Sequence, residues 1–181
     1  MNHIPVKQWL QPIRVEVTRG ERVESFHEVS AVLVYPDGSL QASWGNLDQY
    51  VFPRSAVKPI QALALSSSLA IENQGLSEEE IALACSSHGG ELIHVEGVVK
   101  WLKRLGFNQN DLECGAHWPS HEGSARKLAT QQERPDPVHN NCSGKHSGFL
   151  TLSQQLGVHH KGYIEVNHPV QQKVRSILET L

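Results

Sequence analysis

The sequence Phe52-Pro-Arg-Ser-Ala-Val-Lys-Pro59 marks the point at which the chain changes from strand patterns to helix patterns. Apolar residues recur at helical spacing from Ser55 to Ile71. Pro59 fits only the first turn of such a helix, because its ring clashes with a preceding turn. Ser55 is therefore predicted at or near the helix start, with Lys58 three residues later on the same face.

The residues before this junction follow the two-residue period of β-strands. Ile13 to Thr18 alternates apolar and polar side chains, which predicts a half-buried strand, and Glu28 to Tyr35 predicts a second, more apolar one. Asp37-Gly38 tolerates the positive φ angles of a tight turn and so predicts a hairpin leading into Leu40 to Trp44. Together these segments predict an antiparallel meander.

The residues after the junction predict a helical part. Ser77 and Glu80 are spaced as a capping box for a short helix that runs into Ala84. An apolar stripe ending at Gly106 predicts the next helix, formed by Leu92, Val95, Val98, Val99, Leu102 and Leu105. Three further helices are predicted at Ser124 to Gln131, Ser143 to Leu156, and Pro169 to Leu181.

Composition narrows the class of protein. The chain has 181 residues, 39% of them apolar and 19% charged, with a net charge of -3, which is typical of a soluble globular domain. No basic block indicates a nucleic acid or a membrane surface as partner, and no signal peptide is recognisable, so we expect a cytoplasmic protein. The three cysteines are too few and too widely spaced for a disulfide framework, and Cys85 and Cys114 are predicted to be reduced core thiols.

The first pattern that could carry chemistry is Ser55-Ala-Val-Lys58. On one helical face, a lysine amine can lie beside a serine hydroxyl and act as its general base, and the helix N-terminus favours developing negative charge. Ser-x-x-Lys acyl-transfer enzymes use this arrangement. Alone, the pattern is weak, because it often arises by chance and an ordinary helix start is the more frequent explanation.

The second pattern is Ala84-Cys-Ser-Ser-His-Gly-Gly-Glu91, between two predicted helices. Its glycines allow the backbone to approach a ligand, and Ser87, His88 and Glu91 supply a hydroxyl, an imidazole and a carboxylate within one turn. The simpler alternative is a helix connection with capping hydroxyls.

The third pattern is His139-Asn-Asn-Cys-Ser-Gly-Lys-His146. Cys142 and Lys145 share a helical face, and a cysteine thiolate together with a neutral lysine amine can bind zinc, although two ligands do not complete a zinc site. The alternative is a polar loop that caps a helix at Ser143.

Taken together, six stretches resemble the thermolabile type II asparaginase family (Rhizobium etli type). They occur in the family's order and cover most of the chain: Val15-Glu-Val-Thr-Arg-Gly20, Glu24-Ser-Phe-His27, Phe52-Pro-Arg-Ser-Ala-Val-Lys-Pro59, Ala82-Leu-Ala-Cys-Ser-Ser-His88 with Glu91, Glu113-Cys-Gly-Ala-His-Trp-Pro119, and His139-Asn-Asn-Cys-Ser-Gly-Lys-His146. The resemblance implies an α+β fold related to serine β-lactamases, penicillin-binding proteins and glutaminases, with an antiparallel sheet packed against helices. It also implies that residues 1–181 are the N-terminal portion of one asparaginase domain, whose C-terminal half is absent.

The resemblance further implies roles for individual residues. Ser55 and Lys58 match one catalytic Ser-Lys pair, and Ser87 matches the serine of a second pair whose lysine lies in the absent half. Cys142 and Lys145 match two zinc ligands, the third being a cysteine in that half, and the zinc assists substrate binding. Predicted substrate contacts come from Arg54, His88, Glu91 and Asn141.

The resulting prediction is an amidohydrolase that converts L-asparagine to L-aspartate and ammonia, acts on a small molecule rather than on nucleic acid or a membrane, and forms a homodimer. Either Ser55 or Ser87 is the nucleophile. One alternative is a β-lactamase-like acyl-transferase, although an export signal and the downstream Ser-Asp-Asn and Lys-Thr-Gly motifs are not found in the sequence. The other is an inactive truncated product or a zinc-holding module, and we expect little activity from the 181 residues alone.

Overall fold

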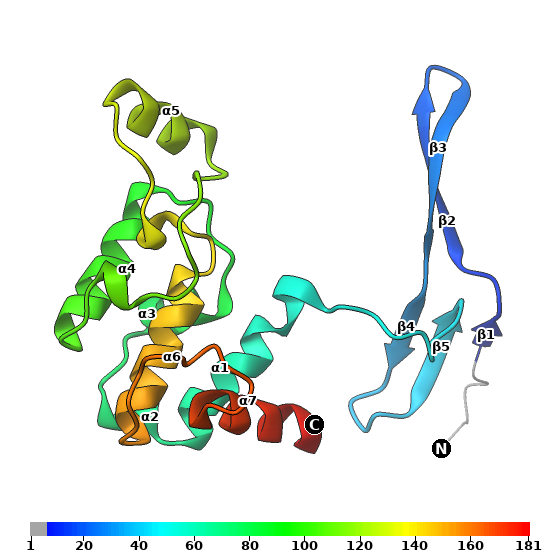
Figure 1. The fold of residues 1–181 in the computed structure, drawn as a ribbon. Coiled ribbons are helices and arrows are strands. Elements are labelled where there is room, and N and C mark those ends of the chain that lie inside the picture. The colour runs from blue at the N-terminus through cyan, green and yellow to red at the C-terminus, as the bar shows by residue number, and fades with distance from the viewer. Residues whose placement is uncertain (1–6) are drawn as a thin grey trace. The chain divides into compact units, whose positions relative to one another are not determined.

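The computed structural model describes residues 7–181 and divides the chain into two compact units, Met1–Phe52 and Pro53–Leu181 (Figure 1). Among the described residues, the regular elements of the first unit are strands and those of the second are helices. This content confirms the α+β class.

The first unit consists of two small sheets. Their strands are β1 (Lys7–Trp9), β2 (Ile13–Arg19), β3 (Arg22–Val29), β4 (Ala31–Val34) and β5 (Leu40–Trp44). The predicted hairpin at Asp37-Gly38 is confirmed: β4 and β5 are antiparallel, and Gly38 has a φ of +82°.

The prediction of a single antiparallel meander is wrong in two respects. β2 and β3 form a separate hairpin, because Gly20, with a φ of +61°, permits a tight turn between them. Polar side chains in this stretch hide the strand pattern in the sequence. In the other sheet, β1 runs parallel to β5. The predicted half-burial of β2 is also wrong, since side chains on both of its faces are exposed in this structure, including Val15 at 47%.

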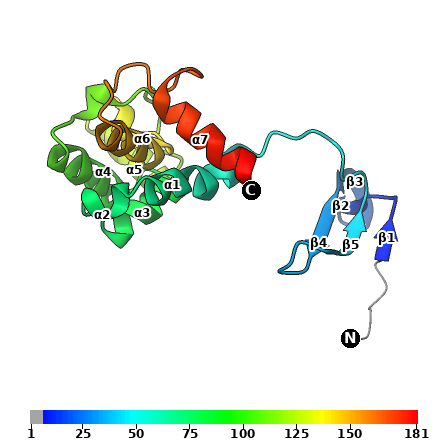
Figure 2. The ribbon, with the colours of Figure 1, turned by 90° about the horizontal axis from the view of Figure 1, so that it is seen from below.

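The second unit is a cluster of helices (Figure 2). The α-helices are α1 (Lys58–Ser67), α2 (Ala70–Asn73), α3 (Glu78–Cys85), α4 (Leu92–Arg104), α5 (Glu122–Thr130), α6 (Ser143–Gln155) and α7 (Pro169–Thr180). Three short 3-10 turns join them: η1 (Arg54–Val57), η2 (Gln109–Asp111) and η3 (Pro137–His139).

Most predicted helices are confirmed, with two changes. The helix predicted from Ser55 to Ile71 starts as η1, becomes α1 at Lys58, and is interrupted at Leu69, whose φ of +59° is left-handed. The capping box of Ser77 and Glu80 forms as expected at the start of α3. In α4 the apolar stripe is only partly buried: Val98 and Leu102 lie in the core, whereas Leu92 and Val99 are exposed.

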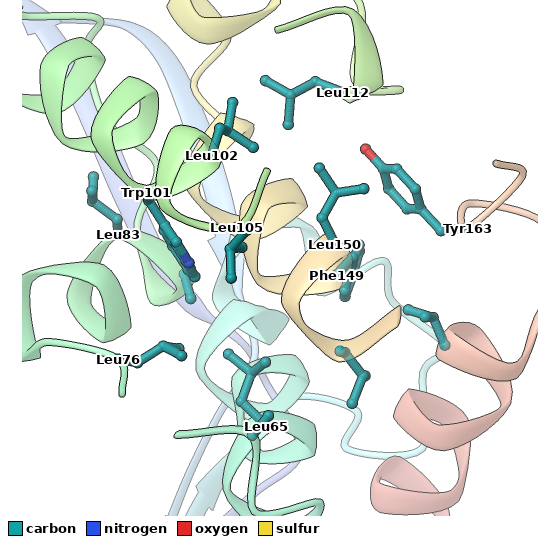
Figure 3. Packing of buried hydrophobic residues seen from close by; sticks show 14 of the residues in the cluster. Leu65, Leu76, Leu83, Trp101, Leu102, Leu105, Leu112, Phe149, Leu150 and Tyr163 are labelled. Carbon is teal, nitrogen blue, oxygen red and sulfur yellow. The ribbon is translucent and has the colours of Figure 1, made fainter. Parts of the chain in front are cut away.

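Helix α6 is the centre of this unit and contacts α1, α2, α3, α4 and α7. Apolar side chains from these neighbours enclose it, among them Leu65 of α1, Leu83 of α3, and Trp101 and Leu102 of α4 (Figure 3). Its own buried hydroxyls are satisfied by donating to the carbonyl four residues earlier, as Ser147, Thr151 and Ser153 do. Small residues therefore let a mildly polar helix occupy the core.

Gly144 sets the distance between α6 and α3. A Cβ atom at this position would lie 2.4 Å from the carbonyl oxygen of Leu83. Because α3 ends two residues after Leu83, this close approach places the end of α3 beside the start of α6. The loops that precede α6 and follow α3 are thereby held next to each other.

Candidate active site

The amine of Lys58 joins three segments of the helical unit. Lys58 is only 3% exposed, and its Nζ atom donates to Ser86 O at 2.7 Å, to Ser87 Oγ at 2.7 Å and to Asn141 O at 3.3 Å. These acceptors belong to the α3–α4 loop and to the residues just before α6. A buried amine needs such partners, because an unpaired polar group in the interior is costly.

Ser55 lies one turn before Lys58, as predicted, and its carbonyl accepts the backbone N–H of Lys58. Its side chain is exposed, and the hydrogen bonds of the Lys58 amine go to the loop of Ser87 instead. Arg54 is also exposed and has a φ of +53°, a strained value for a residue with a side chain. The structure thus pairs Lys58 with Ser87 and gives Ser87 a lysine partner within this chain.

Ser87 stands in an extended turn directly after α3. Ser86, with φ −93° and ψ 163°, ends the helix, and its hydroxyl donates to Leu83 O at 3.1 Å. The Ser87 side chain is exposed above the buried amine. A small molecule can therefore reach the hydroxyl from solvent while the amine contacts it from within the protein.

Gly90 permits the α3–α4 loop to pack closely against Pro119 and His139. It has a φ of +81°, and a Cβ atom there would meet Pro119 Cβ at 2.8 Å and His139 O at 3.2 Å. Neither the backbone angle nor the space suits another residue. Gly90, one of the two glycines predicted to allow close approach to a ligand, therefore serves contacts within the protein.

His88 is buried between this loop and α6. Its Nε2 atom lies 2.8 Å from Ser143 Oγ, and its Nδ1 atom accepts the Gly90 N–H at 3.2 Å. Burial, with smaller contributions from the nearby charges of His94 and Lys58, lowers the pKa of His88 to about 4. The imidazole is therefore neutral at ordinary pH.

Glu91 is the N-terminal cap residue of α4, and its Oε2 atom lies at hydrogen-bond distance, 2.9 Å, from His94 Nδ1. The pKa of the Glu91 carboxyl is lowered by a backbone hydrogen bond and then by the bond to His94. The carboxylate is thus charged near neutral pH, only four residues after Ser87. A fixed negative charge at this place suits a substrate ammonium group.

Asn141 is held by His117, a residue that the sequence analysis did not single out. His117 Nε2 accepts the Asn141 N–H at 3.2 Å, while His117 Nδ1 lies 2.8 Å from Trp118 O. The adjacent Asn140 donates to Cys114 O at 2.9 Å and Gly115 O at 3.0 Å. The only sequence signal for these roles was the match of both stretches to the same family.

Cys142 and Lys145 lie at the first turn of α6, as predicted, with the Cys142 thiol donating to Asn141 Oδ1 at 3.2 Å. Burial lowers the pKa of the Lys145 amine, which favours the neutral form that a metal ligand requires. Among the described residues, no group of three or more His, Cys, Asp or Glu side chains could hold a metal ion. The two donors suit zinc but need ligands from elsewhere.

Comparison with known proteins identifies the family to which the sequence belongs. The family model for L-asparaginase II matches residues 15–181, and no curated protein matches the chain. In the part of the chain that the structure describes, no helix combines the length and apolar character needed to cross a bilayer. The matched residues include the whole helical unit and both loops around Lys58, and the chain therefore belongs to the L-asparaginase II family.

Proposed function

We propose that this protein hydrolyses the side-chain amide of L-asparagine, with Ser87 as nucleophile and Lys58 as its general base. The observation that carries this assignment is the 2.7 Å contact between Lys58 Nζ and Ser87 Oγ, made by a buried amine to an exposed hydroxyl. Membership of the L-asparaginase II family supports the choice of substrate.

The hydrogen bonds of Lys58 suggest how the amine takes up the proton. As a neutral amine, Lys58 has two N–H groups, which suit the carbonyl oxygens of Ser86 and Asn141. The lone pair of the neutral amine would then accept the Ser87 proton across the same 2.7 Å contact at which the ammonium form donates.

The reaction has two halves. Ser87 Oγ attacks the amide carbon as its proton moves to Lys58 Nζ, and the same proton then passes to the departing nitrogen, which leaves as ammonia. Water next attacks the acyl-enzyme ester, with Lys58 again accepting and returning a proton, and aspartate is released. Backbone N–H groups of the loop stabilise the oxyanion, an effect worth about 3–4 kcal/mol per donor in other hydrolases.

Other residues bind the substrate in this proposal. The Glu91 carboxylate attracts the α-ammonium group, and Arg54 and Asn141 are further contacts. Zinc held by Cys142 and Lys145, with ligands from elsewhere, would supply positive charge that helps to bind the substrate. We also propose a homodimer, in line with the family resemblance, which light scattering coupled to size-exclusion chromatography tests.

The test is ammonia release from asparagine by the full-length protein and by Ser87→Ala and Ser55→Ala. The expected result is a loss of at least about 1,000-fold for Ser87→Ala, the scale seen when a hydrolase nucleophile is removed, and a change below about tenfold for Ser55→Ala. Normal turnover by Ser87→Ala would refute the assignment. Turnover of a chromogenic β-lactam without turnover of asparagine would favour the acyl-transferase alternative.

A further inference from the structure

We infer that His88 is a positioning residue for Ser87: its neutral imidazole, with the proton on Nε2, fastens the loop that carries Ser87 to the first residue of α6. The inference deepens the proposed function and rests on it. It differs from the substrate contact that the sequence predicted for His88.

The hydrogen bonds of Ser143 fix the proton of the imidazole. The Ser143 hydroxyl has one proton, which it donates to Val138 O at 3.0 Å. It must therefore accept at the 2.8 Å contact with His88 Nε2, so that Nε2 carries the hydrogen. On the other side of the ring, Nδ1 accepts the Gly90 N–H at 3.2 Å. Both contacts require the same tautomer.

A charged imidazole does not fit this environment. A proton on Nδ1 would face the Gly90 N–H, and two donors would then oppose each other. His88 is 5% exposed, and the groups around it are His94, which stacks on its ring at 5.4 Å, together with Lys58, His117 and Glu91. Three of these four are cationic when protonated and disfavour a further positive charge.

Both ring nitrogens are thus occupied within the protein, which leaves neither free for a substrate or for proton transfer. The ring connects the α3–α4 loop to the residues at the start of α6. These are the two segments that supply the hydrogen-bond acceptors of Lys58. His88 follows Ser87 directly, and Ser143 comes two residues after Asn141. The link therefore keeps Ser87 Oγ and Asn141 O on the same amine.

Three substitutions separate positioning from substrate contact. The amide nitrogen of Gln reaches about as far as Nε2 and can donate to Ser143, whereas the shorter Asn offers only an acceptor near Nδ1. Because a displacement of about 1 Å at a reacting group can lower the rate about 100-fold, His88→Ala is expected to lower kcat about 100-fold and to change KM less than about threefold. His88→Gln should recover kcat to within about tenfold of the unaltered protein, and His88→Asn should not.

The direct test is the ¹⁵N spectrum of the His88 ring in the full-length protein. The expected signature is a hydrogen on Nε2 alone from about pH 5.5 to about pH 9, a range in which an unperturbed histidine titrates. Ser143→Ala should shift the Nε2 resonance and lower kcat without adding to the effect of His88→Ala.

Several results would overturn the inference: a hydrogen on Nδ1, a charged ring near pH 6, a rise in KM with kcat unchanged, or equal recovery by Asn and Gln. Circular dichroism shows whether His88→Ala is folded. If it is misfolded, the kcat values of His88→Gln and His88→Asn test the inference instead. A protein that shows the Nε2–H ring but does not hydrolyse asparagine would support the role of His88 in the loop and refute the proposed function alone.

Discussion

The Nζ atom of Lys58 lies 2.7 Å from the Oγ atom of Ser87, although 29 positions separate the two residues in sequence. The contact depends on the packing of α1 against α3, which brings the loop after α3 onto the first turn of α1. The reactive pair is therefore a product of tertiary structure, unlike the pair of Ser55 and Lys58, which helix geometry alone places one turn apart.

Replacement of Lys58 should strongly reduce activity even when the new side chain is also basic. In Lys58→Arg the guanidinium cannot be deprotonated, so a fall of at least about 100-fold in kcat is expected from loss of the general base. Lys58→Met should also lower the free energy of unfolding by about 2 kcal/mol or more, because the carbonyls of Ser86 and Asn141 lose a donor. Ammonia release and urea denaturation measure the two effects. Substantial activity in Lys58→Arg would contradict the role of the amine as base.

Gly144→Ala is expected to destabilise the helical unit by at least about 2 kcal/mol, since the added methyl would overlap the Leu83 carbonyl at 2.4 Å. The matched control is Gly148→Ala in the same helix. There the nearest atom to a Cβ is a flexible Leu65 methyl at 3.4 Å, so the change should be neutral or stabilising by up to about 1 kcal/mol. Thermal unfolding of both variants tests the close approach of α3 and α6. Equal stability of the two would show that the helices are not packed in this way.

Stability should fall in acid because of His146. Burial lowers the pKa of this histidine to about 3, and its Nδ1 atom lies 2.7 Å from the Tyr163 hydroxyl. That hydroxyl accepts the Glu113 N–H, which leaves its own proton available to the ring. The unfolded chain binds a proton near pH 6.5 and the folded chain only near pH 3. The stability contributed by neutral His146 is thus fully retained above about pH 6.5 and declines by about 1.4 kcal/mol per pH unit from there down to about pH 3.

The control for this acid sensitivity is a substitution that keeps the hydrogen bond. His146→Asn retains an acceptor near Nδ1 and removes the titration, so the slope of unfolding free energy against pH should become shallower. The same change at the exposed His159 should leave the slope unaltered. An unchanged slope in His146→Asn would mean that His146 is not buried in the neutral form.

Zinc binding should depend on Lys145 as a ligand and not only as a charge. Lys145→Arg keeps the charge but offers no lone pair, so it should lose zinc after dialysis, whereas Lys127→Arg on the exposed surface of α5 should keep it. Metal content measured by mass spectrometry compares the two. Full zinc occupancy in Lys145→Arg would exclude this lysine from the metal site.

Local sequence signals predicted much of the helical unit. The capping box of Ser77 and Glu80, the stop at Gly106 and the proline start of α7 each depend on residues close together in sequence, and each is confirmed. The β2–β3 hairpin was missed because the apolar residues of Arg22–Val29, which are Val23, Phe26 and Val29, are spaced three apart and not two. The burial of Trp101 was missed because it lies beside, and not within, the apolar stripe of α4.

The sequence predicted which residues belong to the candidate site but not which hydrogen bonds they make with one another. Sequence placed Lys58, Ser87 and Asn141 among the functional residues, since each lies in a stretch that resembles the family. It could not show that they share one amine, because the contacts span 29 and 83 positions. Similarly, nothing in the order of residues reveals that His117 holds Asn141 or that His88 faces Ser143.

The most direct measurement is peptide mapping of the full-length protein after trapping with a slow amide analogue of asparagine that leaves an acyl group on the nucleophile. The predicted result is an adduct on the peptide containing Ser87, absent from Ser87→Ala and formed much more slowly by Lys58→Arg. An adduct on the peptide containing Ser55 would contradict the pairing of Lys58 with Ser87 as the reactive centre.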